Sequence, residues 1–558
     1  MTTSYSQKNL LNQTINSNKV PKRGRSLSGS IEATDASVTA GSGKHRTEPT
    51  LDLADAVRRM DGDDGDISTD DDDAAVQATR PLVSTRGAVN NAEQRQRDPT
   101  LLLFPPEREL AATSVLCCAC YFPRRIVLLL MTAVALSLAA FCRAILSETV
   151  HAIKDTKRWS DDDEMLIDDA FVWGFAASVL VGGMLSQRYG FKIVLGVGVV
   201  VNALATMLAP FALESFDWIV ASRTFAGAAE GVILPSAYVM MAKWTPLQER
   251  SRTVSLIWGA SYLGGAVGSV WQLIIVQVEQ QLGYALVYVS MGIVGVLWFA
   301  IWLYVVVEQP EDHKTMAQRE RRLILDAVPR PKPGRERRRS ARLSALDWLR
   351  VVFNWPVMAI IVSHLAFSLS IFVFNNTAPT FLRQYSLYPT DNEWLWQGLP
   401  LLLMFVVCLI GGCAADWLVH RRWHPTVVRQ IFQLTGTVLP TLILVLLSLT
   451  YLPPVVMTGM TIFAAALLGL QMAGFATDVL DVSPSFAGVV MAVTLVAACV
   501  PQIGSAFLMP FLLRKFGSWA IPFMVAASFN LFSALMWALC ASGRRTPSDH
   551  TGGSNLQV

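Results

Sequence analysis

The sequence predicts an all-α membrane protein with twelve transmembrane helices, in two halves of six that follow a disordered N-terminal tail. Hydrophobic residues make up 52% of the 558 residues and charged residues only 16%, whereas soluble chains are about a quarter charged. Apolar stretches close to the roughly 20 residues that cross a bilayer recur along the chain. A similar turn follows the second stretch of each half, which indicates an internal repeat typical of secondary transporters.

The tail, residues 1–122, has no helical or strand periodicity and is rich in Ser, Thr, Asn, Asp and Gly, which predicts a disordered cytosolic segment. Its start lacks the apolar stretch of a cleaved signal peptide. The segment 23–26 resembles a kinase site, and 98–103 resembles an acidic dileucine sorting signal. Either would make the tail a partner of signalling or sorting proteins, and a plain solvated tail is the alternative.

The apolar spans define the rest of the domain plan. The N-terminal six-helix half, 123–307, contains predicted spans at 125–149, 166–187, 192–213, 217–241, 253–277 and 283–307. The C-terminal half, 351–541, contains predicted spans at 351–375, 394–416, 428–450, 453–478, 485–509 and 517–541. A polar, basic cytosolic loop, 308–350, joins them and is expected to hold one surface helix near Met316 to Leu325. Residues 542–558 form a cytosolic C-terminal tail.

Charge in the loops predicts the orientation. Lys and Arg gather in alternate loops, and the loops between them are neutral or acidic, as at 161–164; Arg514 and Lys515 are the exception. The basic segments are 188–192, 243–252, 308–350, 421–429 and 544–545. Because positive loops stay cytosolic, both termini are expected in the cytosol of a multi-pass membrane protein. The plasma membrane and an endosomal or lysosomal vesicle both fit.

The repeated turn begins with glycine and ends with charge. Gly183, Arg188 and Gly190 mark it after the second span, and Asp416 and Arg421 mark it after the eighth. We interpret both turns as structural and gating elements rather than binding groups.

The fourth span carries two charges at membrane depth. Arg223 and Glu230 are seven residues apart, so two helical turns place them on one helix face, with Gly227 between them. Such charges are costly unless they face a protein interior or a wet cavity, which makes them candidate functional groups. Gly227 and Gly231 form a small-xxx-small pair that favours close helix packing. The alternative is an Arg223–Glu230 ion pair that only holds helices together.

Several motifs together resemble a known family. They are Arg143-Ala-Ile-Leu-Ser, Phe171-Val-Trp-Gly-Phe, the long pattern from Arg223 to Arg252, and in the second half Asp416, Arg429 and the pattern from Gly474 to Gly488. With twelve spans in a 6+6 repeat, residues 123–547 resemble the major facilitator superfamily. Within it they resemble the anion/cation symporter family of sialin, vesicular glutamate and phosphate-type transporters.

The resemblance implies that Arg143 grips the substrate anion and that Arg223 and Glu230 act in binding, coupling or gating. The residue chemistry agrees, because a guanidinium binds carboxylate or phosphate with two parallel hydrogen bonds and keeps its charge. A buried carboxylate can also exchange a proton. A Glu230 that alternates between pairing with Arg223 and holding a proton would decide which way the transporter opens.

The chain departs from the family pattern at several site positions. Relatives often have an acid at the position of Cys142, and some have a histidine at that of Asp168 and a basic residue at that of Phe367. The family's tyrosine in span seven aligns with Phe372, and its two asparagines in span ten align with Ala476 and Asp478. The second half of the site is therefore less basic than in the glutamate carriers. His364, one turn before Phe367, is a candidate substitute in substrate binding. A packed, hydrogen-bonded histidine is the alternative.

Three acidic positions remain. Asp168, beside Asp169 at the outer mouth of the second span, is a coupling candidate, and solvated acids near a helix N-terminus are the alternative. Asp478 is a second coupling or gating candidate near the end of the tenth span. Asp481 and Pro484 are interpreted mainly as a turn.

These observations predict a secondary active transporter that is embedded in the lipid bilayer. It would carry a small organic or inorganic anion and be coupled to a proton or sodium gradient. One alternative is a non-transporting receptor or scaffold whose tail is the working part; another is a facilitator of neutral solutes such as sugars. Charges at membrane depth argue against both. The sequence has no P-loop, metal-ligand spacing or nucleophile–base arrangement, so no enzyme activity, cofactor, metal or nucleic-acid partner is expected. The cysteines predict no disulfide framework.

Overall fold

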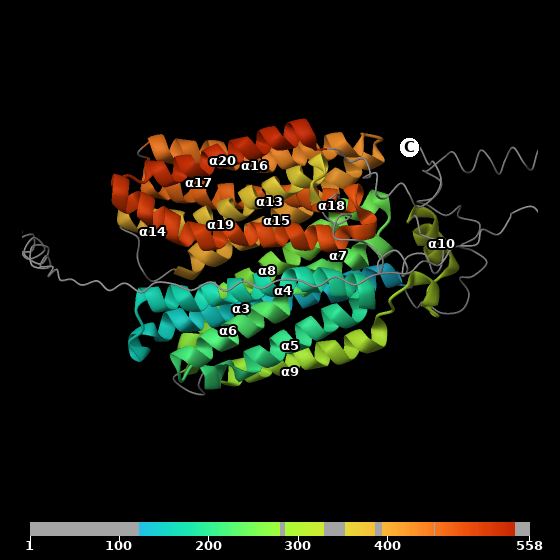
Figure 1. Cartoon of the computed structure of the whole chain (residues 1–558), viewed down its shortest axis with the longest axis horizontal. Coiled ribbons are helices and arrows are strands. Elements are labelled where there is room, and N and C mark those ends of the chain that lie inside the picture. Colours follow the sequence, from blue (N-terminus) through green and yellow to red (C-terminus); the bar gives the residue numbers. More distant parts are fainter. Residues whose placement is uncertain (1–121, 280–284, 329–351, 386–392, 451, 542–558) are drawn as a thin grey trace, which may run out of the picture. The chain divides into compact units, whose positions relative to one another are not determined.

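The structure is a computed structural model that describes residues 122–279, 285–328, 352–385, 393–450 and 452–541. The described residues form helices and short connections, with no strand among them (Figure 1). The predictions for the N-terminal tail, for the basic segment 335–339 and for the C-terminal tail concern residues outside this set.

Among the described residues, the first half contains seven α-helices. They are α3 (Arg124–Lys157), α4 (Asp161–Tyr189), α5 (Phe191–Ala212), α6 (Phe216–Gly231), α7 (Ile233–Trp244), α8 (Arg250–Glu279) and α9 (Ala285–Val305). The predicted helix of the central loop is present as α10 (Gln318–Ala327).

The second half is more interrupted. It contains α13 (Trp355–Phe372), η4 (Val373–Thr377), α14 (Ala378–Tyr385), α15 (Glu393–His420), α16 (Pro425–Leu449), α17 (Pro454–Leu467), η6 (Leu468–Ala473), α18 (Phe475–Val482), η7 (Pro484–Phe486), α19 (Ala487–Phe516) and α20 (Ala520–Cys540). Some of these elements join into one span, such as α17, η6 and α18 over Pro454–Val482.

Within the described residues, 11 helical segments are long and apolar enough to cross a membrane. The predicted fifth span, 253–277, is not one of them and corresponds to α8, a helix of 30 residues. It packs against α3 and α15, both spans, so it occupies the fifth position of the predicted all-α fold.

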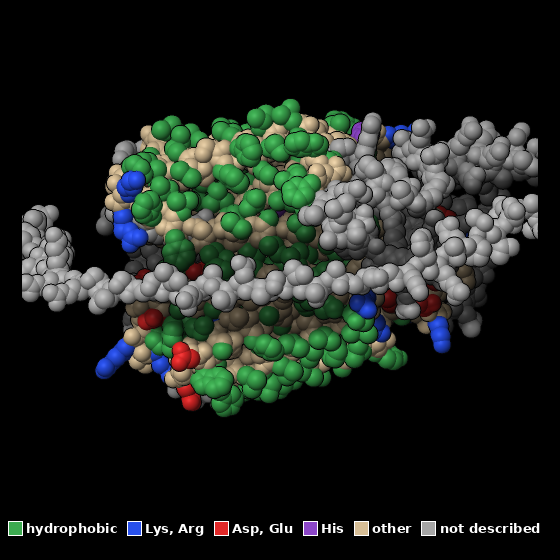
Figure 2. Space-filling model, viewed as in Figure 1, with side chains coloured by type: hydrophobic (Ala, Val, Ile, Leu, Met, Phe, Trp, Pro, Cys, Tyr) green, Lys and Arg blue, Asp and Glu red, His purple; other side chains and the backbone are tan. Residues whose placement is uncertain are grey.

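The membrane unit consists of two helix bundles, α3–α9 and α13–α20 (Figure 1). In the first bundle α4 packs against α6, and α5 against α9; in the second, α13 packs against α19 and α20. The bundles meet where α8 lies against α15 and α4 against α19. Figure 2 shows hydrophobic side chains over the helices, with charged side chains mainly toward the two ends, as expected for helices that face lipid.

Helix α4 begins earlier than the sequence predicts. Ser160 caps it, because the Ser160 hydroxyl accepts a hydrogen bond from the Asp163 amide and the Asp163 carboxylate accepts one from the Ser160 amide. The helix therefore starts at Asp161 rather than near 166. As a result, Asp168 lies about two turns inside the helix and not at its first turn.

Candidate functional site

A cavity of about 620 Å³ lies between the two halves. Helices α3, α4, α6 and α8 line it on one side, and α13, α15 and α19 line it on the other. Five of the predicted site residues line it: Arg143, Asp168, Arg223, Glu230 and His364. The structure thus brings five of the predicted binding and coupling residues to one place.

Arg143 and Glu230 form an ion pair between α3 and α6. The Arg143 Nη1 donates to Glu230 Oε1 over 2.7 Å. The Arg143 side chain is 41% exposed and that of Glu230 only 11%, so the guanidinium faces the cavity and the carboxylate lies behind it. The second carboxylate oxygen of Glu230 is buried and has no hydrogen-bond partner among the described residues.

Arg223 is held differently. It is 2% exposed, and its Nη2 donates to both Ser147 and Asp168, while its Nη1 donates to the Arg143 carbonyl over 3.3 Å. The Ser147 hydroxyl also donates to Asp168. Asp168 is 46% exposed, so here the carboxylate faces the cavity and the arginine lies behind it.

The predicted pairing of Arg223 with Glu230 is therefore wrong in this conformation. The two residues lie on one helix, but each pairs with a residue of a neighbouring helix instead. Both arginines, Arg143 and Arg223, place their guanidinium carbons 5.5 Å from the centre of the Phe171 ring, which makes Phe171 a shared cation–π platform. In the sequence, Phe171 stands out only as part of the motif Phe171-Val-Trp-Gly-Phe.

Close packing of α4 and α6 sets the geometry of these pairs. A Cβ atom at Gly227 would lie 2.1 Å from the Phe171 carbonyl oxygen, and one at Gly231 would lie 2.2 Å from Ser178 Oγ. Any side chain at either position would push the helices apart. Gly227 and Gly231 thus hold Glu230 and Arg223 close to α4, as the small-xxx-small pattern suggests.

One wall of the cavity, formed by α8 and α13, is aromatic. We call Trp258, Tyr262, His364 and Phe367 the aromatic wall; all four line the cavity. The Trp258 ring centre lies 5.7 Å from that of His364 and 6.3 Å from that of Phe367. His364 is 2% exposed and packs on Phe475 at 4.9 Å, and its Nδ1 has no hydrogen-bond partner among the described residues. His364 is packed, as one alternative stated, but it is not hydrogen-bonded through Nδ1.

A second cavity of about 570 Å³ adjoins the first. Asp168, Glu164 and Gln502 line both, whereas Asp169 lines only the second. Asp168 therefore lies where the two cavities meet. We call the end of the bundle where these two cavities meet the mouth; both halves line the cavities there.

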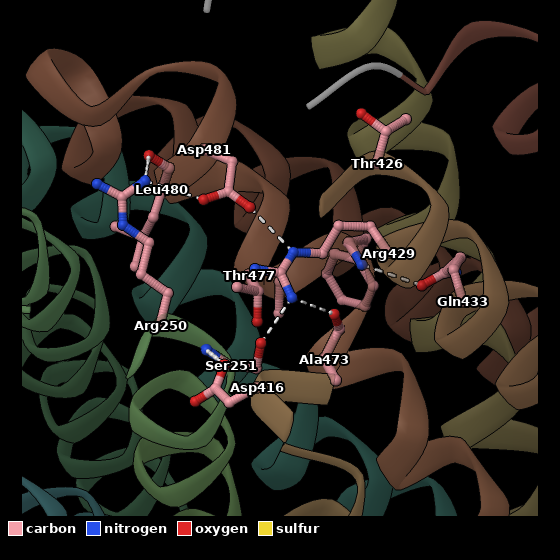
Figure 3. Close-up of polar contacts among 12 residues, drawn as sticks. Arg250, Ser251, Asp416, Thr426, Arg429, Gln433, Ala473, Thr477, Leu480 and Asp481 are labelled. Atoms are coloured by element: carbon pink, nitrogen blue, oxygen red, sulfur yellow. Dashed lines mark hydrogen bonds and ion pairs between the residues drawn. The ribbon is translucent and has the colours of Figure 1, made fainter. Parts of the chain in front are cut away.

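The other end is closed by a buried network that joins the halves (Figure 3). The Arg250 Nη1 donates to Asp481 Oδ1 and to the Leu480 carbonyl, each over 2.9 Å. The Arg429 Nε donates to Asp481 Oδ2 over 2.9 Å, and its Nη1 donates to Ser251 Oγ over 2.6 Å. The turn interpretation of Asp481 is therefore wrong: this residue lies in α18 and accepts hydrogen bonds from two arginines.

Asp416 completes the network, which we call the latch and define as Arg250, Ser251, Asp416, Arg429 and Asp481. Its carboxylate accepts hydrogen bonds from the backbone amides of Ser251 and Arg252, over 3.0 and 2.9 Å. These amides belong to the first turn of α8, so Asp416 of the second half caps a helix of the first half.

The remaining turn residues lie at the same end. A Cβ atom at Gly183 would lie 2.8 Å from that of Ala492, so the halves touch there. Gly190 has a positive φ of 96°, which suits the sharp change of direction between α4 and α5. Arg188 and Arg421 are not part of the latch. Arg188 lies beside the ring of Tyr189 on α4, and Arg421, which directly follows α15, lies beside the ring of Trp417.

Asp478 lies beside the latch and not in the cavity. It is three residues before Asp481 on α18, is 1% exposed, and neither of its carboxylate oxygens has a hydrogen-bond partner among the described residues. It is absent from the residues that line the main cavity. The structure therefore separates it from the substrate-binding candidates.

Two helix bundles around a polar cavity, closed at one end by contacts between the halves, define a membrane carrier of the secondary-transporter type. The chain belongs to the Major Facilitator Superfamily, whose family model matches residues 132–506. Its similarity to several anion transporters also confirms the resemblance to the anion/cation symporter family.

Among the relatives, the chloroplastic ascorbate transporter of Arabidopsis thaliana is 29% identical over 425 residues, which cover 76% of each chain. Sialin of Ovis aries is 28% identical over 412 residues, 71% of this chain and 80% of that one. Among solved structures, the proton:xylose symporter XylE matches with a TM-score of 0.60 and 15% identity, over 75% of this chain and 97% of that one. That similarity concerns the fold alone.

Proposed function

We propose that this protein is a secondary active transporter that carries a small anion through the cavity between its halves, coupled to a proton. One observation carries the proposal: two arginines lie at the cavity, each paired with a carboxylate from another helix. An exchangeable pair of this kind can trade its carboxylate for a substrate anion. Relatives named as ascorbate and sodium-dependent phosphate transporters, together with sialin, support an anionic substrate.

Arg143 is the proposed anion grip and Glu230 the proposed proton site. While Glu230 is charged, its carboxylate forms an ion pair of 2.7 Å with the Arg143 guanidinium. When Glu230 binds a proton, Arg143 loses its partner and a substrate anion can replace it. An arginine at membrane depth without a counter-charge is costly, so proton uptake and anion binding should favour each other. The partner of Glu230 in this scheme is Arg143, in place of the Arg223 that the sequence suggested.

Arg223 has a positioning role in this proposal. It lines the cavity behind Ser147 and Asp168, and its guanidinium becomes free to bind a substrate only if Asp168 moves away. We therefore assign Asp168 to gating where the two cavities meet, with Arg223 as its anchor.

The latch is the proposed inner gate. Basic residues in the loops near the latch favour a cytosolic position for this end and for both termini, so the mouth would face the opposite side. Cysteines placed at 161 and 338 test the orientation with an impermeant thiol reagent on intact cells. Label at 161 without permeabilisation, and at 338 only after it, is expected; the reverse pattern contradicts the assignment.

The function itself is tested by reconstituting the full chain in proteoliposomes with a panel of radiolabelled anions and an imposed pH gradient. Gradient-stimulated uptake of at least one anion is expected. Uptake of neutral sugars, with no uptake of any anion of the panel, would favour the facilitator alternative. Absence of both binding and uptake across the panel would favour a receptor or scaffold.

A further inference from the structure

We infer that the cavity selects an organic anion with a single negative charge and a flat apolar body, in preference to inorganic anions, dianions and polyhydroxylated acids. The inference rests on the proposed transport function and concerns the chemical class of its substrate. It comes from the unequal chemistry of the two cavity walls.

The described lining of the first half supplies one accessible guanidinium, and its one histidine, His151, already contacts Glu164. Among the described residues that line the cavity, the arginines and lysines are Arg143 and Arg223 alone. Arg223 is buried and held by Asp168 and Ser147, whereas the Arg143 side chain is 41% exposed. Acidic side chains are more numerous in the lining: Glu148, Glu164, Asp168 and Glu230. A substrate that displaces Glu230 therefore finds one free guanidinium, and a second negative charge would face acids or rings.

The aromatic wall, from α8 of the first half and α13 of the second, offers mainly rings. Two of its polar atoms are already bonded within the protein: Trp258 Nε1 donates to the Tyr238 hydroxyl over 2.9 Å, and the Tyr262 hydroxyl donates to Met472 Sδ over 3.5 Å. The third, the buried His364 Nδ1, has no hydrogen-bond partner among the described residues. Ser368 donates to a backbone carbonyl over 2.6 Å. A sugar acid placed here would give up its bonds to water without replacing them, whereas a flat apolar body would gain ring contacts.

Cavity size agrees with an organic body. Pockets that hold organic ligands measure about 300–1,000 Å³, and this cavity of about 620 Å³ lies within that range. An inorganic anion such as phosphate would fill a small part of it and would leave the aromatic wall uncovered. The polar lining residues of the second half are His364, Ser368, Asn375 and Gln502; Ser368 already donates to a backbone carbonyl, and Gln502 also lines the adjoining cavity near the mouth.

Phe367 is the proposed selectivity residue. It lies on α13 across the cavity from Arg143, between Trp258 at 6.3 Å and Phe475 at 5.7 Å between ring centres. An arginine at this position would add the second positive charge that a dianion requires, and it would remove a ring from the aromatic wall. Ile371 is one turn further along α13, is partly exposed and also lines the cavity, so Ile371→Arg is a second and gentler version of the same change.

The test uses four probes with the purified full chain: 2-naphthoate, gluconate, succinate and inorganic phosphate. Their affinities are measured at one pH by ligand-dependent thermal stabilisation and by inhibition of uptake of any anion that the proteoliposome panel identifies. We expect 2-naphthoate to bind at least about tenfold more tightly than each of the others. Phe367→Arg, or Ile371→Arg if the first does not fold, should reverse the order of 2-naphthoate and succinate. Phe367→Leu, the matched apolar control, should keep it.

The outcomes separate the two proposals. If gluconate, succinate or phosphate binds the natural chain as tightly as 2-naphthoate, the substrate class is overturned and the transport function stands. If none of the four binds and no anion of the wider panel is transported, the proposed function itself fails. A Phe367→Arg or Ile371→Arg variant that folds and still prefers 2-naphthoate would overturn the role given to α13.

Discussion

The cavity and the latch use the same chemistry with different access to solvent. In the cavity, Arg143 is 41% exposed beside Glu230, and Asp168 is 46% exposed beside Arg223. In the latch, Asp481 is 4% exposed and its two arginines are 1% and 2% exposed. A pair with one accessible member can exchange its partner for a ligand without a large motion. A fully buried network that joins the halves can open only if the halves separate.

The comparison predicts its largest effect at Asp481. Asp481→Asn removes a carboxylate that pairs with both buried arginines of the latch, and breaking a buried ion pair by removing one partner costs about 3–5 kcal/mol. We expect a large fall in thermal stability, or a chain that no longer closes at this end. Melting of the purified protein measures the first. Cross-linking of cysteines at 187 and 485 by a short bifunctional thiol reagent measures the second, because the natural Gln187 side chain donates to the Ser485 carbonyl over 2.6 Å.

Asp217→Asn is the matched control, because Asp217 is an exposed acid in the first turn of α6. It should change stability by less than about 0.5 kcal/mol. Equal melting temperatures for the two variants, with normal cross-linking, would show that the latch does not hold the halves together.

The second prediction concerns Arg143. Arg143→Lys keeps the charge but loses the planar fork that holds a carboxylate with two parallel hydrogen bonds. Uptake at substrate levels below KM should fall about tenfold or more, while the melting temperature changes little because Arg143 is partly exposed. Normal uptake by a folded variant would remove Arg143 from the site.

The third prediction separates coupling from architecture at Glu230. Glu230→Gln mimics the protonated acid and frees Arg143, so substrate exchange by counterflow should persist. One pH unit can support about tenfold accumulation for one coupled proton, and this variant should stop at equal concentrations on both sides. Its uptake is compared with that of the unaltered chain in proteoliposomes. A folded Glu230→Gln protein that still concentrates substrate would exclude the coupling role.

The sequence predicted the spans and the cavity residues because both leave local signals. Apolar stretches of bilayer length mark helices, and a charge inside such a stretch marks a polar interior, as at Arg223 and Glu230. The fifth span was also predicted, and α8 occupies its position.

The pairing of charges could not be predicted. Arg143 and Glu230 are 87 residues apart in the chain, and only the packing of α3 and α6 brings them together. Seven-residue spacing on one helix favoured an Arg223–Glu230 pair, but each side chain has a nearer partner on a neighbouring helix. Asp481, two residues before Ser483 and three before Pro484, carried the local signal of a turn, and its arginine partner Arg429 is 52 residues away.

The last prediction compares two acids on one helix and has the smallest expected effect on stability. Asp478 and Asp481 are three residues apart on α18 and almost equally buried, but Asp481 accepts hydrogen bonds from two arginines and Asp478 accepts none from the described residues. Asn has the shape of Asp without its charge, so Asp478→Asn removes no hydrogen bond of the closed conformation. The free energy of unfolding should therefore stay within about 1 kcal/mol of that of the unaltered chain. If Asp478 gates transport by exchanging a proton when the latch opens, the variant should also show a weaker pH dependence of counterflow. A loss of stability as large as that of Asp481→Asn would show instead that Asp478 is a charged member of the latch.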